Sequence, residues 1–127
     1  MLMRMPVVPP IAVVVAIMIF GVSDAAADQT HRSDDALFDR SSLDDRLRGR
    51  TIVFFDDGKS RFFEDGRYTY TYANDGGTGY GYFAVNDDST ICIDFVTGAS
   101  RCDLYVTDAL NRLVVITANG DRFPVRP

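Results

Sequence analysis

The chain has 127 residues and a formal net charge of −5 at pH 7, from 18 Asp or Glu against 13 Lys or Arg. This acidic balance argues against a nucleic-acid partner, because nucleic-acid binding needs a basic surface. Two cysteines and a single histidine, His31, are too few for a structural zinc site, and His31 falls in a polar segment unsuited to a catalytic triad. We therefore expect no metal, no cofactor and no enzymatic activity.

Residues 1–27 have the pattern of a secretory signal peptide. Arg4 supplies the positive start, residues 11–22 form the apolar centre, and Ala25 and Ala27 are the small residues that cleavage requires. The apolar run is shorter than the ~20 residues needed to span a bilayer, which argues against stable membrane insertion after cleavage. The sequence thus predicts cleavage after Ala27 and export to the periplasm or the cell exterior.

The rest of the chain divides into an arm and one domain. Residues 28–41 are polar and acidic, and we expect a flexible arm that touches the domain only through Leu37 and Phe38. Residues 42–127 are long enough for a single hydrophobic core. They are predicted to form a single all-β domain.

A short helix is predicted at the start of this domain. Ser42 and Asp45 are three residues apart, as in a variant capping box, and Leu43 and Leu47 share one face of a helix. Gly49 is the expected end of the helix.

From residue 50 onward, strand-like runs alternate with turns rich in Asp, Asn and Gly. The predicted strands are 50–55, 60–64, 67–73, 80–85, 90–95, 99–106, 112–117 and 122–125. Eight short strands with a spacing of roughly ten residues predict an antiparallel meander, either closed into a small barrel or folded into a sandwich.

The two cysteines flank a predicted hairpin. A three-residue loop at 96–98 ends in glycine, which adopts the left-handed conformation needed there. With Phe95 opposite Ala99, counting outward places Cys92 directly opposite Cys102, close enough for a disulfide. A disulfide in turn agrees with export to an oxidising compartment.

Five of the six tyrosines lie in a short stretch of the chain and form the candidate binding face: Tyr68, Tyr70, Tyr72, Tyr80 and Tyr82. If Tyr72 pairs with Tyr80, all five share one face of the sheet, which suits a carbohydrate, a peptide or a small aromatic ligand. A shift of one residue instead places the first three with Gly81 and Phe83 in an ordinary core. The sequence leaves both registers open.

The acidic turns at 56–58, 74–76 and 86–88 do not have the spacing of a calcium-binding loop. Asp, Asn and Gly are also the residues that tight turns require, so we interpret these segments as turns. A catalytic pair of carboxylates would make the protein an enzyme, but no pair stands out in the sequence.

The order of these features resembles a known group of proteins. A short helix ends in Leu47-x-Gly49-x-Thr51 before the first strand, an Asp-Gly turn follows, and a later strand contains Arg101-Cys102-Asp103. Over about residues 43–125 this resembles the small lipocalin-like, calycin-type secreted β proteins of Gram-negative bacteria. The tryptophan that lipocalins usually carry after the first glycine is missing, so no binding residues are carried over.

The resemblance implies a binding or interaction role for an exported, disulfide-bonded domain. The partner would be an unknown protein or a small-molecule ligand. Two alternatives follow, a periplasmic inhibitor of a protease or lysozyme and a small-molecule-binding barrel.

Overall fold

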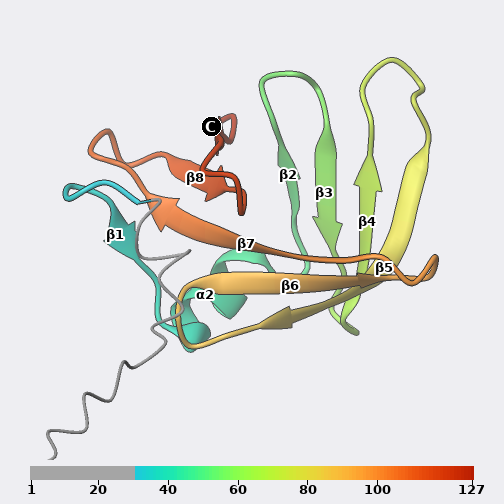
Figure 1. Ribbon diagram of the computed structural model, residues 1–127, viewed down its shortest axis with the longest axis horizontal. Helices are drawn as coiled ribbons and strands as arrows, with labels where there is room; N and C mark the ends of the chain where they lie inside the picture. Colours follow the sequence, from blue (N-terminus) through green and yellow to red (C-terminus); the bar gives the residue numbers. More distant parts are fainter. Residues whose placement is uncertain (1–30) are drawn as a thin grey trace, which may run out of the picture.

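The computed structural model describes residues 31–127 (Figure 1). The predicted signal peptide, residues 1–27, lies outside the described residues. In chain order the described elements are β1 (Ala36–Leu37), α2 (Arg40–Leu47), β2 (Thr51–Val53), β3 (Lys59–Phe62), β4 (Arg67–Thr71), β5 (Thr78–Val85), β6 (Thr90–Phe95), β7 (Ser100–Thr107), β8 (Leu113–Ile116) and β9 (Arg122–Pro124).

The fold is all-β, as predicted. Strands β2 to β9 form an antiparallel meander in which each strand pairs with the next, and β1 pairs with β7. Figure 1 shows the sheet turning through β5, so that β2, β3 and β4 stand at a steep angle to β6 and β7. The meander is thereby curled into a half-barrel. The two edges of the sheet touch at one point. Here Phe54 forms a β-bridge with Val125, and the Arg126 amide donates to the Val53 carbonyl at 2.8 Å.

Glycine on the concave side of β5 permits this curvature. Gly81 is buried and faces Phe95 of β6. A Cβ atom at Gly81 would overlap the carbonyl group of Asp94 on that neighbouring strand. The absence of a side chain therefore allows the two backbones to approach each other closely where the sheet bends.

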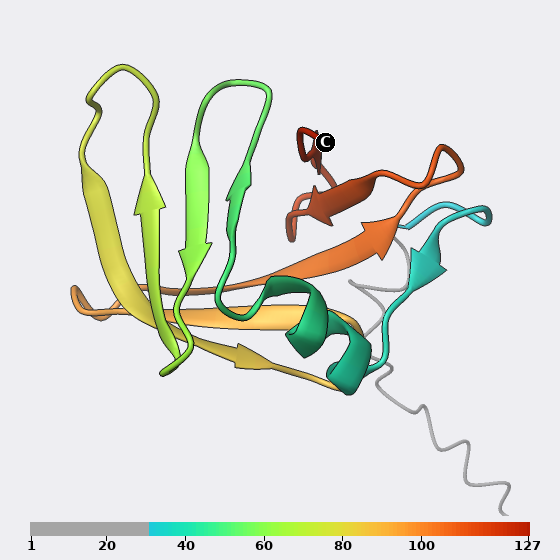
Figure 2. The same ribbon diagram turned by 180° about the vertical axis from the view of Figure 1, so that it is seen from behind.

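Helix α2 closes one end of the half-barrel (Figure 2), where it packs against β5. Leu43 and Leu47 lie on the same face and are fully buried in the core, as predicted. The predicted cap is wrong, because the helix is capped three residues earlier. Asp39 is the N-cap, and its carboxylate accepts the Ser42 amide at 2.7 Å. An aspartate in this position satisfies a helical N–H group, so Ser42 lies inside the first turn.

The main core lies between α2 and the concave side of the sheet. Phe62 is at its centre, with ring centroids 5.2 Å from Tyr68, 5.1 Å from Phe83 and 6.4 Å from Tyr105. The rings of Phe62 and Phe83 are nearly perpendicular, a favourable arrangement for aromatic pairs. A second buried cluster lies on the convex side of β7 and β8 and consists of Leu104, Val106, Val114 and Ile116.

The hairpin of β6 and β7 contains the predicted disulfide. Cys92 is directly opposite Cys102, with Cα atoms 4.0 Å apart, and the two are bonded. Gly98 has the positive φ of 91° expected at the end of the loop, and the Phe95 amide donates to the Ala99 carbonyl at 2.8 Å. The predicted register is therefore confirmed. The disulfide points to an oxidising compartment.

The described part of the segment before α2 is attached to the sheet. The sequence had predicted a flexible arm for this segment. The Asp35 carboxylate, only 1% exposed, accepts two hydrogen bonds from the Arg122 guanidinium at 2.7 and 2.9 Å. The next residues pair with β7, Leu37 being opposite Val106. An ion pair and a strand pairing thus join this segment to the sheet.

Candidate ligand cavity

The concave side of the half-barrel is only partly filled by the core. At the end away from α2 this side contains a cavity of about 590 Å³ that is open to solvent. Residues from β3, β4, β7, β8 and β9, and from the turns beside β2, β4 and β8, line the cavity: Phe54, Asp56, Ser60, Tyr68, Tyr70, Tyr72, Ser100, Arg101, Cys102, Asp103, Tyr105, Val115, Thr117, Ala118, Asn119, Asp121 and Phe123. The walls combine aromatic rings with charged groups.

The register of β4 and β5 separates the five tyrosines of the candidate face. Tyr68 is opposite Gly81 and Tyr70 is opposite Gly79, so Tyr80 and Tyr82 point to the other side of the sheet. The single face of five tyrosines is therefore not formed. Its first three members line the cavity, whereas Tyr80 and Tyr82 are 58% and 59% exposed on the convex side.

The loop between the two strands explains this register. The Tyr72 amide donates to the Gly77 carbonyl at 3.0 Å, and Asn74 and Asp75 both adopt positive φ angles, of 56° and 57°. This compact loop makes Thr71 the partner of Thr78. Tyrosines on the two strands then differ by one position, and a one-residue difference places side chains on opposite faces.

Tyr68 forms the floor of the cavity. Its side chain is buried, and its hydroxyl group lies 2.8 Å from the Ser60 Oγ. Burial raises the pKa of Tyr68 to about 12, because the charged phenolate would lose its hydration, and the hydrogen bond with Ser60 opposes this rise only in part. The hydroxyl is therefore neutral at physiological pH.

Three aromatic rings form a corner at the mouth of the cavity, which we call the aromatic corner: Phe54, Tyr70 and Tyr72. The rings of Tyr70 and Tyr72 are nearly perpendicular, at 81°, with centroids 4.8 Å apart, and Phe54 lies 6.4 Å from Tyr70. Burial is the main cause that raises the pKa of Tyr70, followed by the negative charge of Asp56.

The turn between β2 and β3 places Asp56 beside this corner. The Asp56 carboxylate accepts the Gly58 amide at 2.8 Å. A Cβ atom at Gly58 would overlap the Tyr70 hydroxyl and lie 3.0 Å from Asp56 Oδ1. The hydroxyl and the carboxylate therefore flank the same glycine, whose lack of a side chain leaves room for both.

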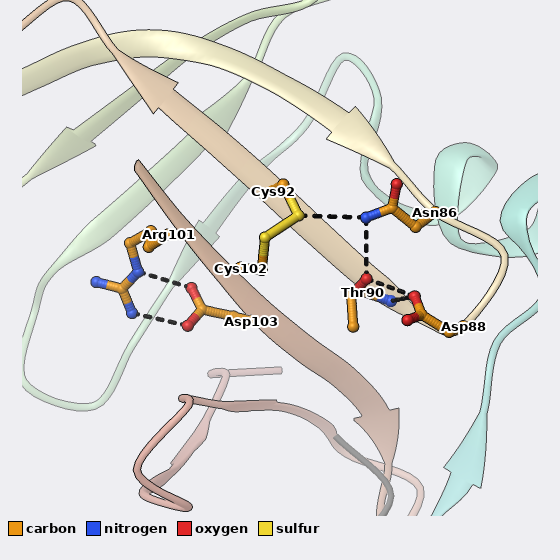
Figure 3. Close-up of a disulfide and its surroundings, with 7 residues drawn as sticks. All are labelled: Asn86, Asp88, Thr90, Cys92, Arg101, Cys102 and Asp103. Atoms are coloured by element: carbon orange, nitrogen blue, oxygen red, sulfur yellow. Dashed lines mark hydrogen bonds and ion pairs between the residues drawn. A yellow bond between two sulfur atoms is a disulfide. The ribbon is translucent and has the colours of Figure 1, made fainter. Parts of the chain in front are cut away.

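The opposite wall carries an ion pair, shown in Figure 3 beside the disulfide. The Nε and Nη2 atoms of Arg101 each donate to one oxygen of the Asp103 carboxylate at 2.9 Å. Asp103 is only 7% exposed. The hydrogen bond to Asp103 is the main cause that raises the pKa of Arg101. The two residues face the cavity because Cys102, which lies between them, faces the convex side.

The charges of the lining do not balance. Asp56, Asp103 and Asp121 are opposed by Arg101 alone, which leaves a formal charge of −2. The lining also includes an unused polar group. Among residues 31–127, the Thr117 Oγ1 atom is buried without a hydrogen-bond partner.

Within the described part of the chain, no group of three or more His, Cys, Asp or Glu side chains is placed to hold a metal ion. The one helix described there is too short and too polar to cross a membrane.

Three charged residues of the cavity were not predicted from the sequence: Asp56, Arg101 and Asp103. A signal for the last two was present, because a strand whose Cys102 pairs on one face must direct Arg101 and Asp103 to the other. No comparable signal marks Asp56, whose position depends on how the turn packs against Tyr70.

The fold defines the protein as a small disulfide-bonded β half-barrel, an eight-strand antiparallel meander compatible with a calycin-like fold. Comparisons of the chain with protein-family models, with curated proteins and with solved structures find no match.

Proposed function

We propose that the protein is an exported, non-enzymatic binding protein that holds a small amphipathic molecule in the cavity of the half-barrel. The observation that carries this proposal is the open cavity of about 590 Å³ with its aromatic and polar lining. Small-molecule sites commonly have volumes of roughly 300–1,000 Å³ and combine apolar walls with a few polar groups. Relatedness to the lipocalin-like proteins of Gram-negative bacteria is part of the proposal and would agree with it.

Filling the cavity tests this function. The neutral fluorescent probe aminoanthracene should bind the wild-type protein with a stoichiometry of one. Thr117→Phe places a ring on the cavity lining and should weaken binding at least about tenfold, a loss of about 1.4 kcal/mol. Asp94→Phe adds the same ring at an exposed position outside the lining and should leave binding unchanged. Equal affinity in all three proteins, or no binding, would contradict the proposal.

A second candidate function is inhibition of a lysozyme or a protease through the convex side. Tyr80 and Tyr82 support it, because they are exposed on the same face of β5 and tyrosines are frequent hot spots in interfaces. The purified protein would then inhibit lysozyme or a protease in an activity assay, and Tyr80→Ser with Tyr82→Ser would abolish the inhibition. No inhibition by the wild-type protein would remove this candidate.

A further inference from the structure

We infer that the ligand carries a cationic ammonium group, which the aromatic corner and Asp56 hold at the mouth of the cavity. This inference rests on the proposed function, because it assigns a chemical class to the ligand of the same cavity.

The first support is the geometry of the aromatic corner. The planes of Tyr70 and Tyr72 stand at 81° to each other, and Phe54 extends the wall beyond Tyr70. The faces of aromatic rings carry partial negative charge, and perpendicular rings of this kind enclose an ammonium group on more than one side. Tyr72 is 58% exposed whereas Phe54 is only 8% exposed, so solvent reaches the corner from the side of Tyr72.

The second support is the position of Asp56. Its carboxylate lies beside Gly58 together with the Tyr70 hydroxyl, and its charge acts on Tyr70. A carboxylate next to an aromatic wall adds direct Coulomb attraction to the cation–π interaction. The ring faces and the carboxylate therefore favour the same sign of charge.

The third support is the state of the arginine across the cavity. Arg101 directs two of its nitrogen atoms at Asp103, so the pair as a whole is neutral. The other charged groups of the lining are Asp56 and Asp121, both negative. An anionic ligand would meet an unfavourable potential, whereas a cationic one would be attracted.

The test compares three probes of similar size that differ in charge: benzyltrimethylammonium, benzyl alcohol and benzenesulfonate. Binding is followed by NMR titration, with the shifts of the cavity residues as the readout. Benzyltrimethylammonium should bind at least about tenfold more tightly than benzenesulfonate, and added salt should reduce the difference.

Matched variants locate the binding group. Asp56→Asn and Tyr72→Leu should each weaken benzyltrimethylammonium about three- to tenfold, in line with the strength of such interactions. The controls Asp94→Asn and Tyr82→Leu make the same changes outside the cavity lining, at exposed positions, and should have no effect. Because the Tyr72 side chain is largely exposed, its replacement should leave the stability of the core unchanged.

The outcomes separate the two proposals. If benzyl alcohol or benzenesulfonate shifts the cavity residues as strongly as the cation, the cavity binds ligands but the ammonium inference is wrong. Equal effects of Asp56→Asn and Asp94→Asn would also overturn it. If none of the three probes shifts the cavity residues, the proposed function itself fails.

Discussion

Replacing Tyr68 with alanine should remove a large part of the stability of the domain, whereas the same change at Tyr82 should remove almost none. Tyr68 is 6% exposed, and its ring packs 5.2 Å from Phe62 and 6.2 Å from Phe95. Truncating a buried aromatic side chain costs about 3–5 kcal/mol, because apolar contacts are lost and a cavity remains. The whole domain is expected to have only about 5–15 kcal/mol of stability.

Urea melts followed by circular dichroism measure the difference. Tyr82 is a suitable control because it belongs to the same stretch of tyrosines and is 59% exposed. Its replacement by alanine should change the free energy of unfolding by no more than about 0.5 kcal/mol. A third variant, Tyr68→Phe, keeps the ring and removes the hydrogen bond to Ser60, which should cost about 1 kcal/mol.

This comparison tests the register of β4 and β5 directly. If Tyr68→Ala and Tyr82→Ala cost the same, the two side chains share one environment and the pairing of Tyr68 with Gly81 is refuted. If Tyr68→Phe costs nothing, the hydroxyl of Tyr68 is not paired with a buried partner.

Two further predictions concern the disulfide and alkaline pH. The protein should contain no free thiols. Because the disulfide closes a ring of eleven residues, the double variant Cys92→Ala with Cys102→Ala should lose about 2.8 kcal/mol of unfolding free energy in urea melts while keeping its far-UV spectrum. An unchanged urea midpoint would contradict this. The raised pKa of Tyr68, about 12 against ~10 for an unfolded tyrosine, means that its contribution to stability is complete below pH ~10 and is lost as the pH rises towards 12. Between pH ~10 and pH ~12 this group should lower the free energy of unfolding of the wild-type protein by up to about 2.7 kcal/mol. The variant Tyr68→Phe lacks the titrating hydroxyl, so its free energy of unfolding should fall by about 2.7 kcal/mol less over the same range. An equal fall in both proteins would show that Tyr68 does not titrate in this way.

The features that the sequence predicted correctly are local. The disulfide register needed only a three-residue loop with Gly98 at its end and a count along two short strands. The positions of Leu43 and Leu47 on one helical face depend only on the helical period. In each case, residues within one hairpin or one helix determine the result.

The features that the sequence left open or predicted wrongly depend on competing local partners. The β4–β5 register was undecided because either pairing of the tyrosines satisfies the strand pattern. The left-handed conformations of Asn74 and Asp75 shorten the loop and decide it. Both Asp39 and Ser42 are residues that can cap the N-terminus of a helix. The capping-box pattern favoured Ser42, whereas Asp39 is the N-cap in the structure. Propensity alone does not rank such alternatives.

The disulfide connects the predictable part of the fold to the cavity, whose lining was predicted only in part. Because side chains alternate along a strand, Cys102 on the convex side forces Arg101 and Asp103 to the concave side. A pair of charged groups in this position is a weak source of stability, since well-packed apolar residues of similar size often stabilise an interior more. Nearer α2 the same concave surface is filled by such residues, with Phe62 and Phe83 in contact. The half-barrel therefore has an end packed with apolar side chains and an open end whose charged lining agrees with the proposed binding function.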